Sequence, residues 1–312
     1  MSRRGWVLFL AMGVVWGIPY LLIKIAVEEL SPPTLVLART ALAAVLLLPI
    51  AFARHQIRPL LSRWRPFLLF TVVEICVPWV LLGYAEQRLS SSLTGLLIAA
   101  VPIVGAVLAL VSGEREPIGT RRLVGLLAGV AGVGALVGFE LGAGDGWAIL
   151  SIAGVVFCYA LGPIILARSL SGLPAFGVVA ASLGVAAILY LPVGIAQAPT
   201  TWPSTEVVLA VVVLAVVCTA LAFLLFFALI AEVGPARSTV ITYVNPAVAV
   251  LLGVVLLDET FTVAAAVGFA LILLGSVLAT SRTAPVESAP VAPAPRSRDL
   301  DCAQVGQPVA EP

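Results

Sequence analysis

GWVLFLAMGVVW, residues 5–16, and GWAILSIAGVVF, residues 146–157, are the two stretches that decide the architecture of this chain. Five of the twelve aligned positions are identical, and both stretches begin an apolar segment long enough to cross a hydrocarbon core of ~30 Å. A segment that recurs at mid-chain indicates an internal duplication. The chain therefore reads as two related halves.

Further matches extend the duplication to the end of each half. The offset drifts from 141 to 144 residues, which small loop insertions explain. The matching pairs are Pro102 with Pro246, Glu116 with Glu259, Gly125 with Gly268, and Gly132 with Gly275. The repeating unit holds five apolar segments, and an odd number of spans reverses direction, so the two halves are expected to have opposite orientations in the membrane. Inverted repeats around a midplane site are a common plan of secondary transporters.

Composition places the chain among membrane proteins. Hydrophobic residues make up 61% and charged residues 11% of it, whereas soluble domains average about 45–50% and about 25%. The fold class predicted is an all-α polytopic membrane protein with ten transmembrane helices. The expected spans are 5–27, 33–53, 66–86, 91–112, 121–139, 146–168, 173–195, 206–231, 236–257 and 261–281.

The basic residues predict the orientation. Fourteen of the 17 Lys and Arg residues fall in connections on one side, only Arg88 lies on the other, and Lys24 and Arg39 lie within spans. Cytoplasmic connections carry the excess of basic residues, so both termini are expected in the cytoplasm. Residues 282–312 are rich in proline and lack periodicity, which predicts a disordered cytoplasmic tail.

Several short motifs resemble the EamA domain of the drug/metabolite transporter superfamily. They are Trp16-Gly17, Lys24, Ser31-Pro32, Arg39, and the series Pro246, Glu259, Gly268 and Gly275 with its first-half copy Pro102, Glu116, Gly125 and Gly132. The resemblance covers 5–139 as a first repeat and 146–281 as a second. It implies a ten-helix inner-membrane carrier with a central cavity, whose relatives move amino acids, sugars, nucleotide-type metabolites or drugs, often outward.

Charged residues inside the spans are the first candidates for function. Glu74 lies near mid-depth of its span, where a charge costs on the order of 2.5–3.5 kcal/mol. It is interpreted as part of an ion pathway, a solute contact or a proton site; the alternatives are a partner of Arg39 and a protonated, hydrogen-bonded core acid. Arg39 could bind a carboxylate or phosphate, snorkel to the interface, or pair with Glu28 or Glu29. Lys24 is shallower, so snorkelling competes with solute contact.

Aromatic and amide side chains beside helix-breaking residues complete the candidate cavity. A mostly apolar cavity with a few polar groups suits a small metabolite. The candidates are Trp16, Tyr20, Trp79, Tyr243 and Asn245, with interface anchoring as the alternative reading of the aromatics.

Glycine and proline recur near mid-span and are interpreted as hinges. Each proline frees a backbone carbonyl, which a membrane tolerates only where another group covers it or a cavity surrounds it. The hinge candidates are Gly17, Pro19, Pro78, Pro102, Pro163 and Pro246. Gly125-x-x-x-Gly129 and Gly134-x-x-x-Gly138 are read instead as faces for close helix packing.

The sequence contains no enzyme motif, metal-ligand pattern or nucleic-acid-binding patch. We therefore expect no catalytic activity, no bound cofactor or metal, and no nucleic-acid partner. The predicted function is export of a small metabolite, such as an amino acid or drug-like solute, across the bacterial inner membrane by alternating access, with protons as a candidate coupling ion. The alternatives are an intramembrane enzyme and a non-transporting membrane scaffold. The sequence selects neither the solute nor the oligomeric state.

Overall fold

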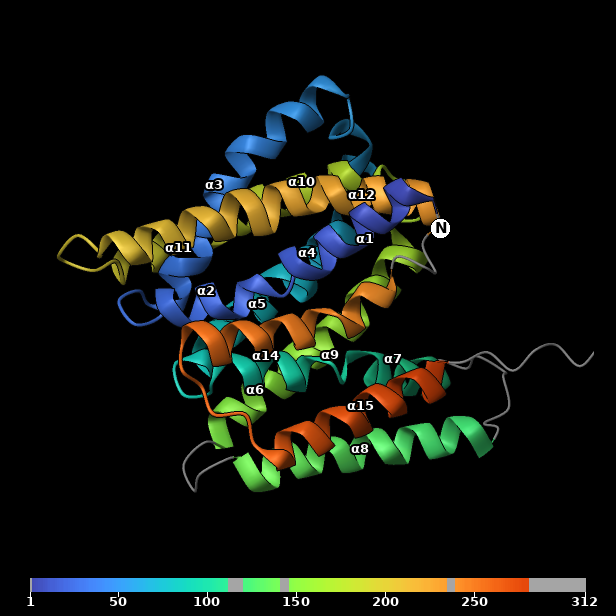
Figure 1. Cartoon of the computed structure of the whole chain (residues 1–312). Helices are drawn as coiled ribbons and strands as arrows, with labels where there is room; N and C mark the ends of the chain where they lie inside the picture. Colours follow the sequence, from blue (N-terminus) through green and yellow to red (C-terminus); the bar gives the residue numbers. More distant parts are fainter. Residues whose placement is uncertain (1, 112–119, 141–145, 235–238, 281–312) are drawn as a thin grey trace, which may run out of the picture. The chain divides into compact units, whose positions relative to one another are not determined.

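The computed structural model describes residues 2–111, 120–140, 146–234 and 239–280, and all regular secondary structure in these ranges is helical (Figure 1). The α-helices are α1 (Arg3–Val15), α2 (Ile18–Ala26), α3 (Pro32–Ala53), α4 (Trp64–Thr71), α5 (Val77–Glu86), α6 (Ser91–Ile98), α7 (Val101–Val111), α8 (Thr120–Glu140), α9 (Gly146–Ser169), α10 (Ala175–Ala196), α11 (Thr205–Ala215), α12 (Ala222–Val233), α14 (Asn245–Leu256) and α15 (Val263–Thr280). Two 3-10 helices, η1 (Arg58–Arg63) and η4 (Thr239–Tyr243), and two π-helical segments, η2 (Val72–Cys76) and η3 (Val216–Leu221), complete the described part.

Seven helical stretches are long and apolar enough to cross a membrane. They are Arg3–Ala26, Pro32–Ala53, Arg58–Glu86, Ser91–Leu108, Gly146–Ser169, Ala175–Ala196 and Thr205–Val233. Three shorter apolar helices, Leu123–Gly138, Ile241–Leu256 and Val263–Leu278, fall where the sequence predicts the remaining three spans. The all-helical membrane fold is confirmed, while the count of ten spans stays a prediction. The predicted tail lies outside the described residues.

Large apolar side chains project outward along these helices. Val45 and Ile188, for example, are 69% and 70% exposed. Aqueous surfaces rarely carry such extended apolar area, whereas lipid chains solvate it without cost. The apolar exterior is therefore the surface that a bilayer covers.

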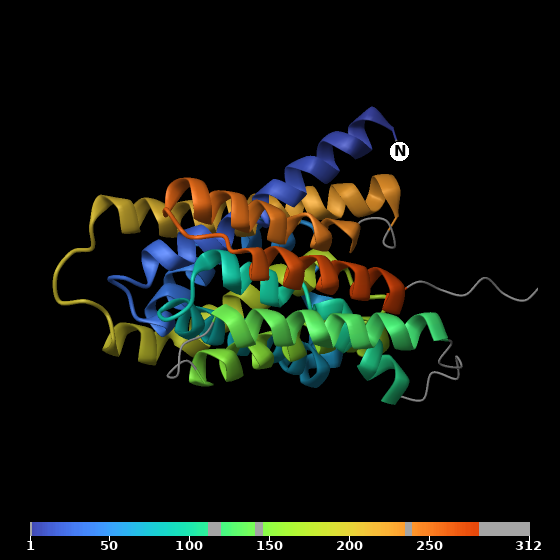
Figure 2. The same ribbon diagram turned by 60° about the horizontal axis from the view of Figure 1, so that its bottom comes forward.

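Each helical stretch packs mainly against one stretch of the other half. α8 lies along α15, α3 along α10, α5 along α9, and α6 along α14, while α1 and α2 contact α12 and α11 (Figures 1 and 2). The α8–α15 contact is close because glycines face each other: a Cβ at Gly275 would lie 2.5 Å from the backbone nitrogen of Gly129. Gly132 and Gly268 approach in the same way.

The second predicted glycine face makes no such contact. A Cβ at Gly134 or Gly138 would meet nothing within 4 Å in the described structure. The interpretation of these two glycines as a packing face is therefore not supported, because the α8 surface that α15 covers is the one carrying Gly125, Gly129 and Gly132.

Breaks in the helices coincide with most of the hinge candidates. α1 ends before Gly17, α6 ends shortly before Pro102, and α14 begins at the residue before Pro246. Pro163, in contrast, lies inside α9, which runs without interruption over 24 residues. Hinge motion at any of these positions stays a prediction.

Side chains from other helices cover two backbone carbonyls near these breaks. Ser276 donates to the carbonyl oxygen of Ala99 at 3.3 Å, at the break between α6 and α7. The Tyr190 hydroxyl donates to the carbonyl oxygen of Cys76 at 2.9 Å, at the end of η2. The breaks thus meet the requirement that freed backbone groups in a bilayer be satisfied within the protein.

Candidate functional site

Arg39 is a buried cation on α3 whose side chain contacts η3 and α5. α3 begins at Pro32 after an N-cap by Ser31, which places Arg39 two turns inside the helix, where it is only 8% exposed. Its Nε donates to Thr219 Oγ1 at 2.9 Å, and its guanidinium carbon lies 3.7 Å from the centroid of the Trp79 ring. Within the described ranges no carboxylate lies within ion-pair distance of it. Its guanidinium therefore keeps donors for a bound anion.

Glu74 lies in η2 and faces α9. Any Cβ at Gly162 would collide with the Glu74 carboxylate, so the glycine leaves the space that this side chain occupies. Glu74 Oε2 is buried and has no hydrogen-bond partner among the described residues. The structure does not bring Glu74 and Arg39 into an ion pair, so the reading of Glu74 as Arg39's partner fails. A buried carboxyl oxygen without a partner is costly unless a ligand or proton satisfies it.

Tyr159 on α9 interacts electrostatically with both of these groups. Its hydroxyl is within electrostatic range of Glu74 and Arg39 and lies beside the Trp79 side chain. Tyr20 on α2 is buried next to Gly95 and lies within range of Tyr159 and Arg39. We call Arg39, Glu74, Trp79, Tyr159 and Tyr20 the central cluster.

Both π-helical segments contribute to the contacts around this cluster. Glu74 lies in η2, and Thr219, which binds Arg39, lies in η3. A π-helical turn widens the helix, redirects side chains and occurs frequently at functional sites. After η2, Pro78 cannot donate the α-helical hydrogen bond to the Glu74 carbonyl; Thr219 Oγ1 donates to the Leu214 carbonyl at 2.8 Å in η3.

Trp16 belongs to a different aromatic group. Its ring centroid lies 4.7 Å from that of Phe226 and 6.0 Å from that of Phe223, both on α12. It lies at the break between α1 and α2, on the side of the first helix pair that α12 covers. No described contact joins it to Arg39 or Glu74.

Asn245, the first residue of α14, forms a hydrogen bond with the backbone of α1. With its amide oriented by its hydrogen-bond partners, it donates to the carbonyl oxygens of Ile241 at 3.0 Å and Gly13 at 3.1 Å. Beside it, a Cβ at Gly17 would lie 2.9 Å from the Asn245 carbonyl oxygen and 2.5 Å from Val248. Asn245 and Gly17 thus hold two broken helices close together. Tyr243, half-buried in η4, also lies outside the central cluster.

Lys24 binds backbone rather than facing the central cluster. Its Nζ donates to the carbonyl oxygens of Glu86 at 2.7 Å and Leu89 at 2.8 Å, at the C-terminus of α5. A cation there is stabilised by the negative end of the helix dipole. Lys24 thus caps a helix, a role that differs from both the snorkelling and the solute contact predicted from the sequence.

Glu259 caps the N-terminus of the neighbouring helix α6 with a charge opposite to that of Lys24. Its carboxylate accepts from the backbone N–H groups of Ser91 at 2.7 Å and Ser92 at 2.9 Å, the first residues of α6. We call Lys24, Glu259 and the turn that they hold, residues 86–92, the turn clamp. Glu116, the predicted counterpart of Glu259, lies outside the described residues.

A third contact joins the loops at the same end. The Ser204 N–H donates to Glu29 Oε2 at 2.7 Å, and hydrogen bonds from Ser204 hold the pKa of the Glu29 carboxyl below its usual value. At the other end, Arg63 donates to the carbonyl oxygens of Ser169 at 3.1 Å and Ser171 at 3.0 Å. Each end of the bundle is thus joined by contacts between its own connections.

Sequence reasoning missed Thr219 and Glu86. Thr219 is one of many small polar residues in apolar segments, and only the fold brings it to Arg39. Glu86 ends a predicted span, where a carboxylate normally reaches water. In the structure it is 0% exposed, and neither carboxylate oxygen has a partner among the described residues.

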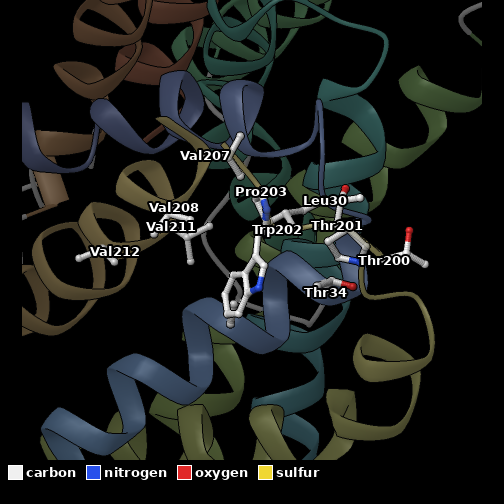
Figure 3. A pocket seen from close by; sticks show the side chains of 12 residues that line it. Leu30, Thr34, Thr200, Thr201, Trp202, Pro203, Val207, Val208, Val211 and Val212 are labelled. Carbon is white, nitrogen blue, oxygen red and sulfur yellow. The ribbon is translucent and has the colours of Figure 1, made fainter. Parts of the chain in front are cut away.

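A surface cavity of about 390 Å³ lies apart from the central cluster (Figure 3). Its walls come from the start of α3, the connection before α11, and α11 itself, including Thr34, Pro203 and Val211. Trp202 is one of the residues that line the cavity and is 95% exposed. An exposed indole beside apolar helices is typical of the membrane interface. None of the predicted site residues lines this cavity.

Comparison with known proteins relates the chain to a family of membrane transporters. The EamA-like transporter family matches residues 3–138 and again residues 146–281. The chain is 31% identical over 279 residues to "Uncharacterized inner membrane transporter YedA" of Escherichia coli (strain K12), covering 86% of this chain and 88% of the relative. It is 23% identical over 282 residues to "Uncharacterized transporter YvbV" of Bacillus subtilis (strain 168), covering 86% and 89%.

A solved structure described only as "Crystal structure of protein" shares the fold. It superposes with a TM-score of 0.65 at 20% identity and covers 89% of this chain and 98% of its own. The helical bundle with its apolar exterior defines a multi-pass membrane protein, and the family match places it among membrane transporters. The chain belongs to the EamA-like transporter family.

Proposed function

We propose that this chain is a secondary transporter that exports a small metabolite, such as an amino acid or drug-like solute, across a bacterial inner membrane by alternating access. The central cluster carries this proposal. Among the described residues, it contains a buried guanidinium without a carboxylate partner and a buried carboxyl oxygen without a hydrogen-bond partner, together with aromatic side chains. Such groups are costly in a protein interior, and an arriving solute or proton would satisfy them.

The proposed architecture is two inverted repeats of five spans. If the two halves are related by a shift of five spans, the first span corresponds to the sixth and the eighth span to the third. A contact between the first and eighth spans then implies a matching contact between the sixth and third spans. The pairing of α1 and α2 with α12 and α11, and of α5 with α9, has this form. The two π-helical segments also begin 144 residues apart, at Val72 and Val216, within the offset of the sequence repeat. These observations support a fold whose halves can exchange tilts.

The proposed orientation has both termini in the cytoplasm. The basic residues favour it, and the contacts at the two ends of the bundle agree with alternating spans. The turn clamp and the Glu29–Ser204 contact join connections expected outside. The Arg63 contact joins connections expected inside. The inner-membrane location and the transport activity also rest on the name of the Escherichia coli relative.

Arg39 and Glu74 are proposed to share the solute. The guanidinium offers planar donors that suit a carboxylate or phosphate. Glu74 accepts a cationic group of the solute, or holds a proton while that site is empty. Trp79 and Tyr20 supply apolar walls and one polar atom each, as small-molecule sites commonly do.

Lys24 and the hinge candidates have supporting roles in this proposal. Lys24 closes the outer end through the turn clamp. The breaks at Gly17, Pro102 and Pro246 are proposed to allow segments to tilt. Pro19 and Pro78, at the starts of α2 and α5, and Pro163, inside α9, are proposed as further flexible points. Trp16 and Tyr243 are proposed to line the path rather than bind the solute at rest.

An accumulation assay in proteoliposomes tests the function. Purified protein is reconstituted, and the uptake of labelled amino acids, sugars, nucleotides and cationic drugs is measured under imposed pH, sodium and potential gradients. We expect saturable movement of one solute class above that of protein-free liposomes. Movement of none of them under any gradient would favour the scaffold reading, and chemical conversion of a solute without its movement would favour an intramembrane enzyme.

A further inference from the structure

Glu86 is a fully buried carboxyl at the centre of the turn clamp. It is the last residue of α5, and both of its oxygens lack a hydrogen-bond partner among the described residues. The charged groups around it are Lys24 on α2, Glu259 between α14 and α15, and Arg39 on α3. The Tyr20 hydroxyl on α2 also lies within range.

None of the nearby charged side chains forms an ion pair with the Glu86 carboxyl in the described part of the chain. The Lys24 ammonium is bound to two backbone carbonyls, the Glu259 carboxylate to two backbone N–H groups, and the Nε of Arg39 to Thr219. A lone carboxylate buried without a cation or donor costs far more than a neutral carboxylic acid. The geometry therefore suits a group that carries a proton while the clamp is closed.

We propose that Glu86 is a second proton-binding site of this transporter, the outer one, through which the coupling proton enters. This proposal rests on the transport function proposed above. When the outer end opens, the clamp separates and Glu86 reaches water, where it accepts a proton from outside. When the clamp closes, the proton is sealed in.

Electrostatic interactions through two tyrosine hydroxyls connect this site with the central cluster. Glu86 lies within electrostatic range of Tyr20, Tyr20 within range of Tyr159, and Tyr159 within range of Glu74. While the outer end is open, Glu86 passes its proton by way of these groups to Glu74, becomes charged in contact with water, and takes up another proton from outside before the clamp closes. Glu74 later releases its proton to the cytoplasm, so that one proton moves inward for each solute that moves outward and Glu86 stays neutral inside the closed clamp.

Infrared spectroscopy of the full chain tests the protonation directly and needs no solute. The C=O stretching band of a protonated carboxylic acid is separate from the bands of carboxylates. We expect the wild type to show this band at neutral pH, Glu86→Gln to lose one component of it, and Glu86→Asp to keep that component at a shifted frequency. The control Glu206→Gln, an exposed residue of α11, leaves the band unchanged. A Glu86→Gln spectrum identical to that of the wild type overturns the proposal, and if this variant does not fold, an unshifted band in Glu86→Asp overturns it.

Transport by the same variants separates this inference from the proposed function. With the solute that the wild type exchanges, Glu86→Gln is expected to keep counterflow within about twofold while its accumulation driven by a pH gradient falls at least tenfold. Tyr20→Phe is expected to lower the driven accumulation in the same direction. Full driven accumulation by Glu86→Gln, or wild-type accumulation that ignores the pH gradient, overturns the inference alone. A wild type that exchanges no solute at all overturns the proposed function, whatever the infrared result.

Discussion

The guanidinium carbon of Arg39 lies 3.7 Å from the centroid of the Trp79 ring, while the Nε of Arg39 donates a hydrogen bond to Thr219. Three predicted spans meet in this contact, the second, third and eighth. Cation–π contacts contribute about 2 kcal/mol or more when desolvated. The two contacts fix the guanidinium, and its terminal nitrogens take no part in the hydrogen bond to Thr219, which suits the proposed role of Arg39 in binding solute.

Replacing Arg39 by Lys tests this arrangement. An ammonium cannot stack as a plane on Trp79 and donate to Thr219 in the same geometry. We expect the initial rate of solute exchange to fall about tenfold or more, with the amount of folded protein unchanged. Arg88→Lys is the matched control, because Arg88 is exposed. Equal rates for both variants would remove Arg39 from the solute site.

Glu74→Gln tests the role of the buried carboxyl. Glutamine keeps the size and removes the ionisation, so the dependence of counterflow on pH is expected to flatten, with the rate changed less at low pH than at high pH. The measurement is the rate of counterflow across a pH series. Glu28→Gln, at an exposed position, should retain the wild-type profile. An unaltered profile in Glu74→Gln would show that Glu74 exchanges no proton during transport.

Gly162→Ala tests the packing that positions Glu74. The added Cβ overlaps the carboxylate, and overpacking of this kind typically costs about 1–3 kcal/mol. We expect a lower thermal unfolding midpoint and slower transport. Adding Glu74→Ala should recover the midpoint but not the transport, because the clash and the carboxylate are removed together. Gly146→Ala in the same helix, where a Cβ meets nothing within 4 Å, should leave both unchanged. Additive losses in the double variant would contradict a direct contact.

Gly275→Ala tests the contact between α8 and α15. Its Cβ would press on the backbone of Gly129, which cannot move aside as a side chain can, so unfolding in detergent should occur at a clearly lower temperature. Gly138→Ala places a Cβ in open space and should be neutral or slightly stabilising, since alanine is favoured over glycine in helices by about 1 kcal/mol. Similar effects from the two substitutions would contradict the observed helix face.

Much of the fold could be predicted because apolar length and repeated motifs are visible along the chain. In sequence Gly125 aligns with Gly268 and Gly132 with Gly275. In space these glycines meet crosswise, because Gly132 approaches Gly268 while Gly275 approaches Gly125 and Gly129. The π-helical segments could not be predicted: Pro78 follows the first, but Ala222 follows the second, so no local signal accounts for both.

The candidate site was predictable only in part. Arg39, Glu74 and Trp79 stand out because charge and aromatic groups are conspicuous in apolar segments. Lys24 was singled out for its charge and Asn245 as an amide beside a helix-breaking proline, yet both bind backbone carbonyls of other helices. Which acceptor a side chain reaches is decided by tertiary packing, and the burial of Glu86 depends on three elements that are distant in sequence.

Counterflow in proteoliposomes tests the central claim most directly. Vesicles containing wild-type protein are loaded with an unlabelled solute and diluted into a trace of the same labelled solute without any ion gradient. A carrier with alternating access is predicted to take up label transiently, only when the vesicles are preloaded, and Arg39→Lys is predicted to reduce that peak. Uptake that is indifferent to preloading, or that equals protein-free vesicles for every solute tested, would contradict a carrier built on the Arg39–Glu74 site.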